Sequence, residues 1–342
     1  MAISHDEALM SPSLLHIQDL VTVFPGPRGD LVAVDGLELS LSPGEILGLV
    51  GESGCGKTMT ALSVMGLVPP PGRVAGGRII FDGQDLLRVD QERLRQVRGA
   101  EIAMIFQEPM TSLNPVFTIG RQVAEGLLAH GALSKRQAYQ RAAEALAKVG
   151  IPDAARRMKA YPHQLSGGMR QRVMIAMALV AGPRLVIADE PTTALDVTIQ
   201  AQILELMRRL QAEVGAAFLL ITHNLAVVAE MASRVGVMYT GRLVEICGVR
   251  ELFAEPLHPY SAGLMACLPA MAERRGQRLN TIGGTVPPLD ALPPGCAFSD
   301  RCPRRFDPCQ EAEPALAEVA PGRWVRCFLH HDQVRDRSRE AA

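Results

Sequence analysis

A glycine-rich loop near the N-terminus has the composition of a phosphate-binding site. Its sequence is GESGCGKT. Gly51 and Gly56 would let the backbone curl so that its amide N–H groups point inward at an anion. Lys57 would reach the β- and γ-phosphates of a nucleotide, and the hydroxyl of Thr58 could bind Mg²⁺. The residues of this segment that we expect to contact the nucleotide are Gly51, Glu52, Ser53, Gly54, Cys55, Gly56, Lys57, Thr58 and Met59.

The segments on either side of this loop fit such a site. Residues 45–50 have the pattern of a buried strand, and residues 59–67 have the pattern of a helix. We therefore expect a helix N-terminus to face the phosphates, which a chance glycine turn would not provide. Cys55 stands where serine is common in such loops. We favour a simple match in size over the alternative, an oxidisable thiol beside the nucleotide.

Two carboxylates follow a second apolar run, at residues 185–188. The carboxyl end of a buried parallel strand is where α/β sheets bind their ligands. Asp189 would hold Mg²⁺, largely through water. Glu190 would orient the attacking water and take its proton. A pair of carboxylates that only caps a strand is the alternative, and the phosphate loop upstream makes it less convincing.

Three further motifs complete an ordered set. They are FQEP at 106–109, LSGGMRQR at 165–172 and ITH at 221–223. The second of these resembles the signature motif of ABC ATPases, and all five motifs stand in the order of that family. The resemblance implies an α/β fold, an ABC-type P-loop ATPase with a RecA-like core, an antiparallel β subdomain and a helical subdomain.

The resemblance also implies roles for residues outside the phosphate loop. Gln107 would sense Mg²⁺ and the transport partner, and His223 would touch the γ-phosphate. Phe24 stands where the family stacks an aromatic ring on adenine, with a core phenylalanine as an almost equal alternative. The implied catalytic residues are Glu190, His223 and Gln107. The implied ligands of Mg²⁺ are Thr58, Gln107 and Asp189.

The signature motif implies a second subunit. In the family, it contacts the γ-phosphate that the phosphate loop of the other subunit holds, so two subunits close head to tail around ATP. Ser166 suits a helix N-cap, and glycines allow close approach to an anion at a helix start. The implied nucleotide contacts outside the phosphate loop are Phe24, Gln107, Ser166, Gly167, Gly168, Gln171, Asp196 and His223.

Longer motifs narrow the resemblance to the permeases for dipeptides, oligopeptides and nickel. They are QEPMTSLNP at 107–115, YPHQLS at 161–166, PTTALDVTIQ at 191–200 and HPY at 258–260. The chain looks most like the D-type ATPase of such a permease. This implies hydrolysis of ATP that powers an importer for peptides, with nickel or glutathione-like solutes as the alternative cargo. The implied partners are an F-type second ATPase subunit, two transmembrane permease subunits and an extracytoplasmic solute-binding protein.

Composition agrees with this interpretation. The net charge is −1 and hydrophobic residues make up 48% of the chain, so a core is expected and no basic field for nucleic acid is evident. A soluble ABC ATPase acting on nucleic acid is therefore disfavoured. No apolar stretch reaches the ~18 residues of a membrane span, and no signal-peptide core is visible. We expect a protein at the cytoplasmic face of the membrane, attached through permease subunits.

The coarse organisation can be read from the hydrophobic pattern. Residues 14–24 and 31–41 are expected to form a small antiparallel sheet, and residues 136–149 an amphipathic helix. Further core strands are expected at 101–106, 184–188 and 217–221. Further helices are expected at 199–211 and at 251–268, the latter with Pro256 near a turn. The predicted divisions are a tail at 1–12, an ABC ATP-binding domain at 13–254 with a helical subdomain at about 110–180, and a permease-type extension at 255–342.

Four cysteines cluster in that extension, with the spacing C-x5-C-x6-C-x17-C. Inside a cell, four clustered thiols argue for a metal rather than disulfides. They fit a [4Fe–4S] cluster or tetrahedral Zn²⁺, and the absence of C-x2-C pairs favours iron–sulfur. Some members of the permease group carry such a cluster in this region, so the resemblance implies the same; four unliganded thiols are the remaining alternative. The cysteines are Cys296, Cys302, Cys309 and Cys327.

Overall fold

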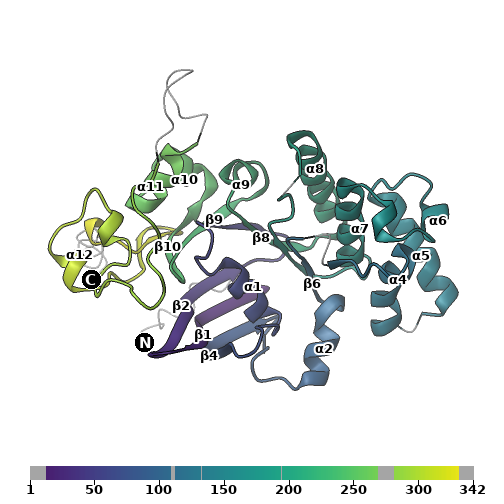
Figure 1. Cartoon of the computed structure of the whole chain (residues 1–342), viewed down its shortest axis with the longest axis horizontal. Helices are drawn as coiled ribbons and strands as arrows, with labels where there is room; N and C mark the ends of the chain where they lie inside the picture. The colour runs from purple at the N-terminus through teal and green to yellow at the C-terminus, as the bar shows by residue number, and fades with distance from the viewer. Residues whose placement is uncertain (1–12, 109–111, 132, 194, 269–280, 331–342) are drawn as a thin grey trace, which may run out of the picture. The chain divides into compact units, whose positions relative to one another are not determined.

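The computed structural model describes residues 13–108, 112–131, 133–193, 195–268 and 281–330 (Figure 1). Their backbone contacts form two compact units. The first unit lies within residues 1–16, 40–46 and 79–221, and the second within residues 17–39, 47–78 and 222–342. The predicted tail at 1–12 lies outside the described residues.

Three parallel strands form the centre of the first unit. They run side by side in the order β6 (Ile102–Ile105), β7 (Leu185–Asp189) and β8 (Ala217–Thr222). Every residue of β7 and β8 is buried, as expected of strands covered on both faces. Because β6 and β7 pair in parallel, their carboxyl ends lie next to each other. The unit also contains a short strand, β5 (Gln84–Asp85), which pairs with the end of β4 (Arg73–Phe81).

Helices make up most of the rest of the first unit. Figure 1 shows α4, α5, α6 and α7 gathered together, and the contacts of α4, α5 and α7 with one another agree. Ser134 and Gln137 form a capping box that begins α5, as the polar residues before this amphipathic segment suggest. The helices found among the described residues of this unit are α2 (Gln91–Ala100), α4 (Ile119–His130), α5 (Lys135–Lys148), α6 (Ala154–Arg157), the short 3₁₀ turn η1 (Pro162–Gln164), α7 (Gly167–Leu179) and α8 (Val197–Val214).

The second unit holds two sheets. In one, the strands lie in the order β2 (Gly29–Leu41), β1 (Leu15–Gly26) and β4. In the other, β3 (Ile46–Val50) is parallel to β9 (Arg234–Tyr239), and β10 (Arg242–Gly248) follows β9 antiparallel. Three helices also belong to this unit before the C-terminal region: α1 (Lys57–Val64), α9 (Leu225–Met231) and α10 (Val249–Ala254).

The C-terminal region continues the second of these sheets. Strand β12 (Arg323–Val325) pairs antiparallel with β10, and β11 (Ala317–Ala320) pairs with β12. Helices α11 (Pro259–Ala266) and α12 (Pro308–Glu311) and the 3₁₀ turns η3 (Ser299–Arg301) and η4 (Phe328–His330) complete it. Figure 1 shows the yellow part of this region, which follows α11, beside β10.

A shared aromatic core explains how the cysteine-rich segment folds without a large core of its own. Phe298 is 2% exposed and packs on Tyr239 and Tyr260, with ring centroids 5.3 and 5.4 Å away. Tyr239 belongs to β9 and Tyr260 to α11, so the segment uses apolar partners from earlier in the chain. Such pairs contribute about 0.5–1.5 kcal/mol beyond the area that they bury.

The observed elements differ from the predicted ones in a few places. The first helix after the phosphate loop begins at Lys57 rather than at 59, because Gly56 is its N-cap. The segment predicted to be helical at 251–268, with a turn near Pro256, forms two separate helices, since Glu255 leaves the helical conformation next to this proline. Among the described residues, no helix is both long enough and apolar enough to cross a membrane.

Candidate functional site

The phosphate loop lies in the second unit, between β3 and α1. Gly51 has a φ of +154°, and a Cβ there would come within 2.2 Å of the carbonyl oxygen of Met238. Gly56 has a φ of +103°, and its Cβ would lie 2.5 Å from the carbonyl oxygen of Ala33. Only glycine fits at both positions, so the loop conformation depends on them.

Lys57 folds back over this loop. Its ammonium donates hydrogen bonds to the carbonyl oxygens of Gly51 at 2.7 Å and Glu52 at 2.9 Å, and the residue is only 5% exposed. The cation is therefore held over the loop by the loop's own carbonyl oxygens. Ser53 and Gly54 are exposed, and Thr58 and Met59 are half-buried at the start of α1.

Cys55 is 1% exposed, and burial raises the pKa of its thiol although the Lys57 ammonium opposes this shift. A protonated, covered thiol is a poor nucleophile and a poor target of oxidants. The structure thus agrees with the interpretation of Cys55 as a residue that matches serine in size.

Two other predicted nucleotide contacts belong to the second unit. The half-buried ring of Phe24 lies against Gly72, where a Cβ would come within 2.5 Å of the ring. Glycine at 72 therefore makes room for this aromatic residue. His223 is exposed and lies between β8 and α9, directly before the N-cap Asn224.

In the first unit, the ends of β6 and β7 bring Gln107 to Glu190. The register pairs Ile105 with Ala188, so the residues that follow lie side by side. The amide of Gln107 donates to Glu190 Oε2 at 3.1 Å, and the Thr193 hydroxyl donates to the same oxygen at 2.8 Å. The glutamate carboxylate is therefore oriented by two donors.

The backbone at Glu190 is also unusual. Its φ is +47°, in the left-handed region that non-glycine residues rarely adopt, and its N–H donates to the carbonyl oxygen of Ile221 at 2.8 Å. Such a conformation costs of order 1–3 kcal/mol and persists where the surrounding structure imposes it. The preceding residue, Asp189, is buried at the end of β7.

The signature segment begins α7 in the first unit. Ser166 is the N-cap, and its hydroxyl accepts the N–H of Met169 at 3.3 Å. A Cβ on Gly167 would meet open space, whereas one on Gly168 would lie 2.9 Å from Ile199 of α8. Gly167 thus leaves the helix start open to a ligand, while Gly168 allows α7 and α8 to approach closely.

Two more predicted contacts of the first unit have structural partners. Gln171 is 1% exposed, and its amide donates to the carbonyl oxygen of Pro191 at 2.6 Å, so it connects α7 to the turn after Glu190. Asp196 is exposed and caps α8 by accepting the N–H of Ile199 at 2.9 Å. Residue 194 lies outside the described residues.

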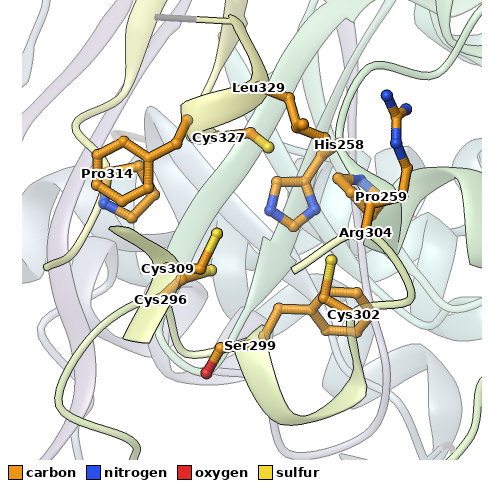
Figure 2. A pocket seen from close by; sticks show the side chains of 12 residues that line it. His258, Pro259, Cys296, Ser299, Cys302, Arg304, Cys309, Pro314, Cys327 and Leu329 are labelled. Carbon is orange, nitrogen blue, oxygen red and sulfur yellow. The ribbon is translucent and has the colours of Figure 1, made fainter. Parts of the chain in front are cut away.

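The four clustered cysteines line one cavity of the second unit. Figure 2 shows Cys296, Cys302, Cys309 and Cys327 around this cavity, with the imidazole of His258 among them. Cys296, Cys302 and Cys309 are near neighbours in sequence, whereas Cys327 and His258 come from other segments of the C-terminal region, and all five side chains line the cavity. In the described part of the chain, however, no three or more His, Cys, Asp or Glu side chains are grouped closely enough to hold a metal ion.

The electrostatics of this cavity are those of a covered site. Burial raises the pKa of the Cys296 and Cys302 thiols, and that of Cys327 to about 11. Each of these thiolates would also be disfavoured by the negative charge of its neighbouring cysteines. Burial lowers the pKa of His258 to about 3, so its ring is neutral, and its Nδ1 accepts the N–H of Tyr260 at 3.0 Å.

Thr193 is a candidate functional residue that sequence reasoning missed. It lies three residues after Glu190, in a motif that was used only as a sign of the family. A hydroxyl at this spacing can return to a carboxylate across a tight turn, and the N–H of Thr193 also donates to the carbonyl oxygen of Glu190 at 3.2 Å. The local spacing was the only signal available for it.

Comparisons with known proteins agree with the motifs. The ABC transporter family matches residues 34–193, and the C-terminal region of oligopeptide/dipeptide transporters matches residues 244–309. The chain is 50% identical over 327 residues to the oligopeptide transport ATP-binding protein AppD of Bacillus subtilis, covering 95% of this chain and 99% of AppD. It is 48% identical over 316 residues to the oligopeptide transport ATP-binding protein OppD of Escherichia coli, covering 92% of this chain and 93% of OppD.

A solved structure is also similar. The ATP-binding cassette MJ0796, determined as a dimer in a post-hydrolysis state with ADP and phosphate, superposes with a TM-score of 0.62 at 26% identity. It covers 69% of this chain, and the match takes in 99% of that cassette. The predicted ABC-type P-loop ATPase fold is therefore confirmed. Since identity near one half extends through both the ATPase segment and the C-terminal region, this chain belongs to the ABC transporter ATP-binding proteins of the oligopeptide/dipeptide family.

Proposed function

We propose that this chain hydrolyses ATP to power the import of peptides, as one of two ATPase subunits that serve two transmembrane permease subunits. The observation that carries the proposal is the identity of 50% along 99% of AppD, an oligopeptide transport ATP-binding protein. The separate match of residues 244–309 to the C-terminal region of oligopeptide/dipeptide transporters supports the peptide class of cargo.

The hydrolytic roles follow from the contacts within each unit. On nucleotide binding, Lys57 exchanges the carbonyl oxygens of its own loop for phosphate oxygens, while the backbone N–H groups of the loop cradle the same phosphates. Thr58, Gln107 and Asp189 are the proposed ligands of Mg²⁺, which neutralises phosphate charge. Glu190 takes the proton of the attacking water, and the donors Gln107 and Thr193 fix the direction of its carboxylate. His223 contacts the γ-phosphate.

A second subunit completes the site. Ser166, Gly167 and Gly168 form an open helix start of positive dipole, which suits the γ-phosphate that the partner's phosphate loop holds. Gln171 lies on the same helix, α7, and Asp196 caps the start of the neighbouring helix α8. The MJ0796 cassette was solved as a dimer, which supports the same arrangement here. We propose an F-type ATPase as the partner, and Phe24 as the residue that stacks on adenine.

The chain itself would not touch the solute. A solute-binding protein outside the membrane would deliver the solute to the permease subunits, and this chain would lie at the cytoplasmic face, attached through them. Nickel or a glutathione-like solute would use the same machinery. Action on nucleic acid finds no support in the balanced charge of the chain.

The cysteine cavity has the donor set of a [4Fe–4S] cluster. Four thiolates, one for each iron, is the usual ligation of this cluster, and Cys296, Cys302, Cys309 and Cys327 supply them. The spacing of these cysteines lacks the C-x2-C pairs typical of structural zinc sites, which favours a cluster over the alternative, Zn²⁺. His258 would add an N–H donor and not a ligand, because its Nδ1 already accepts the N–H of Tyr260, which places the proton of the neutral ring on Nε2.

The test of the function uses the assembled complex in membranes or nanodiscs. ATPase activity would be measured with the solute-binding protein empty, loaded with oligopeptides, loaded with nickel and loaded with glutathione. We expect stimulation by oligopeptides, and none in a complex that carries Glu190→Gln. Stimulation by nickel or by glutathione, without stimulation by oligopeptides, would show that the importer transports the alternative solute.

A further inference from the structure

The C-terminal region contacts the phosphate loop itself. The guanidinium of Arg301 donates two hydrogen bonds to the carboxylate of Glu52, at 2.7 Å to Oε2 and 3.0 Å to Oε1. The hydroxyl of Tyr260 accepts the backbone N–H of Glu52 at 2.8 Å. Both the side chain and the backbone of the second residue of the loop are therefore held by residues that lie far beyond the ATPase motifs.

The side chain of Arg301 is buried and is held by several further contacts. Its side chain is 4% exposed, its Nε donates to the carbonyl oxygen of Gly283 at 2.9 Å, and the guanidinium lies 5.8 Å from the ring centroids of Tyr239 and Phe298. A bidentate arginine–carboxylate pair is stronger and more directional than a single neutral hydrogen bond. In a covered position, losing one partner leaves the other charge uncompensated. The position of Glu52 is consequently tied to that of Arg301.

Arg301 in turn belongs to the turn that presents two of the clustered cysteines. This turn, η3, is flanked by Cys296 and Cys302, which both line the cysteine cavity. The N–H of Ser299 donates to the carbonyl oxygen of Cys296 at 2.8 Å, and the N–H of Cys302 donates to that of Ser299 at 3.3 Å. A short hydrogen-bonded turn thus carries cavity-lining thiols at its ends and the loop-holding arginine within it.

We propose that Arg301 is a positioning residue for nucleotide binding, and that it couples occupancy of the cysteine cavity to the conformation of the phosphate loop. An occupant bound through Cys296 and Cys302 would fix η3, and η3 would hold Glu52 and the loop in the shape that receives phosphates. By linkage, nucleotide binding and cavity occupancy then favour each other by the same factor. The coupling to the cavity rests on the proposed metal centre, whereas the role of Arg301 in holding the loop does not.

The first experiment tests the arginine in the full-length chain, with ADP as the probe so that no turnover occurs. Arg301→Gln should raise the Kd for ADP about 3- to 30-fold, since binding must then order a loosened loop. Arg301→Lys should recover part of the loss, because lysine keeps the charge but not the bidentate geometry. Arg305→Gln is the matched control: Arg305 lies in the same segment, its side chain is half exposed, and its guanidinium forms a 3.9 Å ion pair with Asp300.

A milder variant, which removes a single hydroxyl, tests the same contact even if the arginine variants misfold. Tyr260→Phe should raise the Kd for ADP about 2- to 5-fold, the effect of one lost hydrogen bond to the loop backbone. Thermal unfolding would establish that each variant is folded. Wild-type ADP affinity in folded Arg301→Gln and Tyr260→Phe would overturn the positioning role.

The second experiment tests the coupling. The wild-type chain and Arg301→Gln would each be stripped of metal anaerobically and then reconstituted with ferrous iron and sulfide. We expect reconstitution to lower the Kd for ADP at least about 3-fold in the wild type and to leave it nearly unchanged in Arg301→Gln. An equal change in both proteins, or none in either, would overturn the coupling. A wild-type chain that takes up neither iron nor sulfide would instead overturn the metal centre, and the coupling with it, while the first experiment still decides the role of Arg301.

Discussion

The amide of Gln107 donates to the carboxylate of Glu190 at 3.1 Å, across the adjacent ends of β6 and β7. Since Thr193 donates to the same oxygen, two donors fix the direction of this carboxylate. Gln107 is exposed at the end of β6. A change at Gln107, such as contact with a permease subunit, would therefore reach the proposed general base directly.

Replacement of Glu190 by glutamine tests the base. Glu190→Gln keeps the size of the side chain but cannot accept a proton from water, so we expect nearly normal ATP binding and an ATPase rate lower by at least about 100-fold. Steady-state hydrolysis and equilibrium binding would be measured on the same preparation. Near-normal turnover would remove Glu190 from this role. Lys57→Ala should behave differently and weaken nucleotide binding itself.

Thr193→Val tests whether the orientation of the carboxylate matters. The change removes the 2.8 Å hydrogen bond to Glu190 and keeps the shape of the side chain. We expect kcat to fall about 3- to 10-fold, the effect of roughly one hydrogen bond, with little change in KM. Thr193→Ser keeps the hydroxyl and should retain most of the activity. A rise in KM without a fall in kcat would place Thr193 in binding rather than in catalysis.

Much of this site could be predicted because its parts are local in sequence. The phosphate loop needs glycines at fixed spacing and a lysine beside them, and the structure shows why, since a Cβ on Gly51 or Gly56 would collide with backbone oxygens. The buried strands at 185–188 and 217–221 were also recognisable, because each is a continuous apolar run in the sequence. The Arg301–Glu52 pair joins residues that no local pattern connects, so only the folded chain reveals it.

The fold of the C-terminal extension could not be predicted from its sequence. Its cysteine-rich stretch has few large apolar residues, so no core could be predicted for it from the sequence. In the structure, β12 pairs with β10 and Phe298 packs on Tyr239 and Tyr260, so part of the missing core comes from earlier in the chain. Long-range strand pairing of this kind leaves no signature in composition. Strand β9 and helix α2 were likewise not predicted, and the predicted domain boundaries stay predictions.

Ser166→Arg tests the role of α7 in a second subunit's site. An arginine at the N-cap places a bulky cation at the positive end of the helix dipole, where a phosphate would otherwise bind. We expect the isolated subunit to bind ATP normally and the ATP-driven dimer to be lost. Size-exclusion chromatography with ATP, in a Glu190→Gln background that prevents turnover, would measure this.

Ser134→Arg is the matched control for that experiment. Ser134 is also a serine N-cap, at the start of α5, and its hydroxyl accepts the N–H of Gln137 at 3.4 Å. It should cost a similar amount of stability, on the order of 1 kcal/mol, yet leave the ATP-driven dimer intact. Loss of ATP binding by isolated Ser166→Arg subunits would instead assign Ser166 to the subunit's own nucleotide site.

Cys55 should be protected from alkylation. The thiol is covered and its pKa is raised by burial, so little thiolate is available at neutral pH. With iodoacetamide we expect Cys55 of the folded chain to react at least about 10-fold more slowly than the half-buried Cys267. Mass spectrometry of timed samples would measure both rates, and unfolding in urea should make them similar. Rapid modification of Cys55 in the folded chain would revive the idea of a redox-sensitive thiol at the nucleotide.

The proposed cluster in the cysteine cavity predicts the iron and sulfide content of the protein. If Cys296, Cys302, Cys309 and Cys327 hold one [4Fe–4S] cluster, protein purified without oxygen should be brown and contain about four irons and four labile sulfides per chain. Since a metal centre that binds only the folded chain adds its binding free energy to stability, removal of the metal should lower the unfolding temperature.

Serine substitutions separate this cluster from adventitious iron. Cys302→Ser removes one ligand and should reduce the iron and sulfide content as well as the unfolding temperature. Cys267→Ser is the matched control, because Cys267 is half-buried in the same C-terminal region but does not line the cavity, and it should leave both quantities unchanged. Colourless protein that holds one zinc per chain after anaerobic purification from iron-replete cells would replace the cluster with a zinc site. Equal iron loss in Cys302→Ser and Cys267→Ser would show that the iron is not bound through the cavity at all.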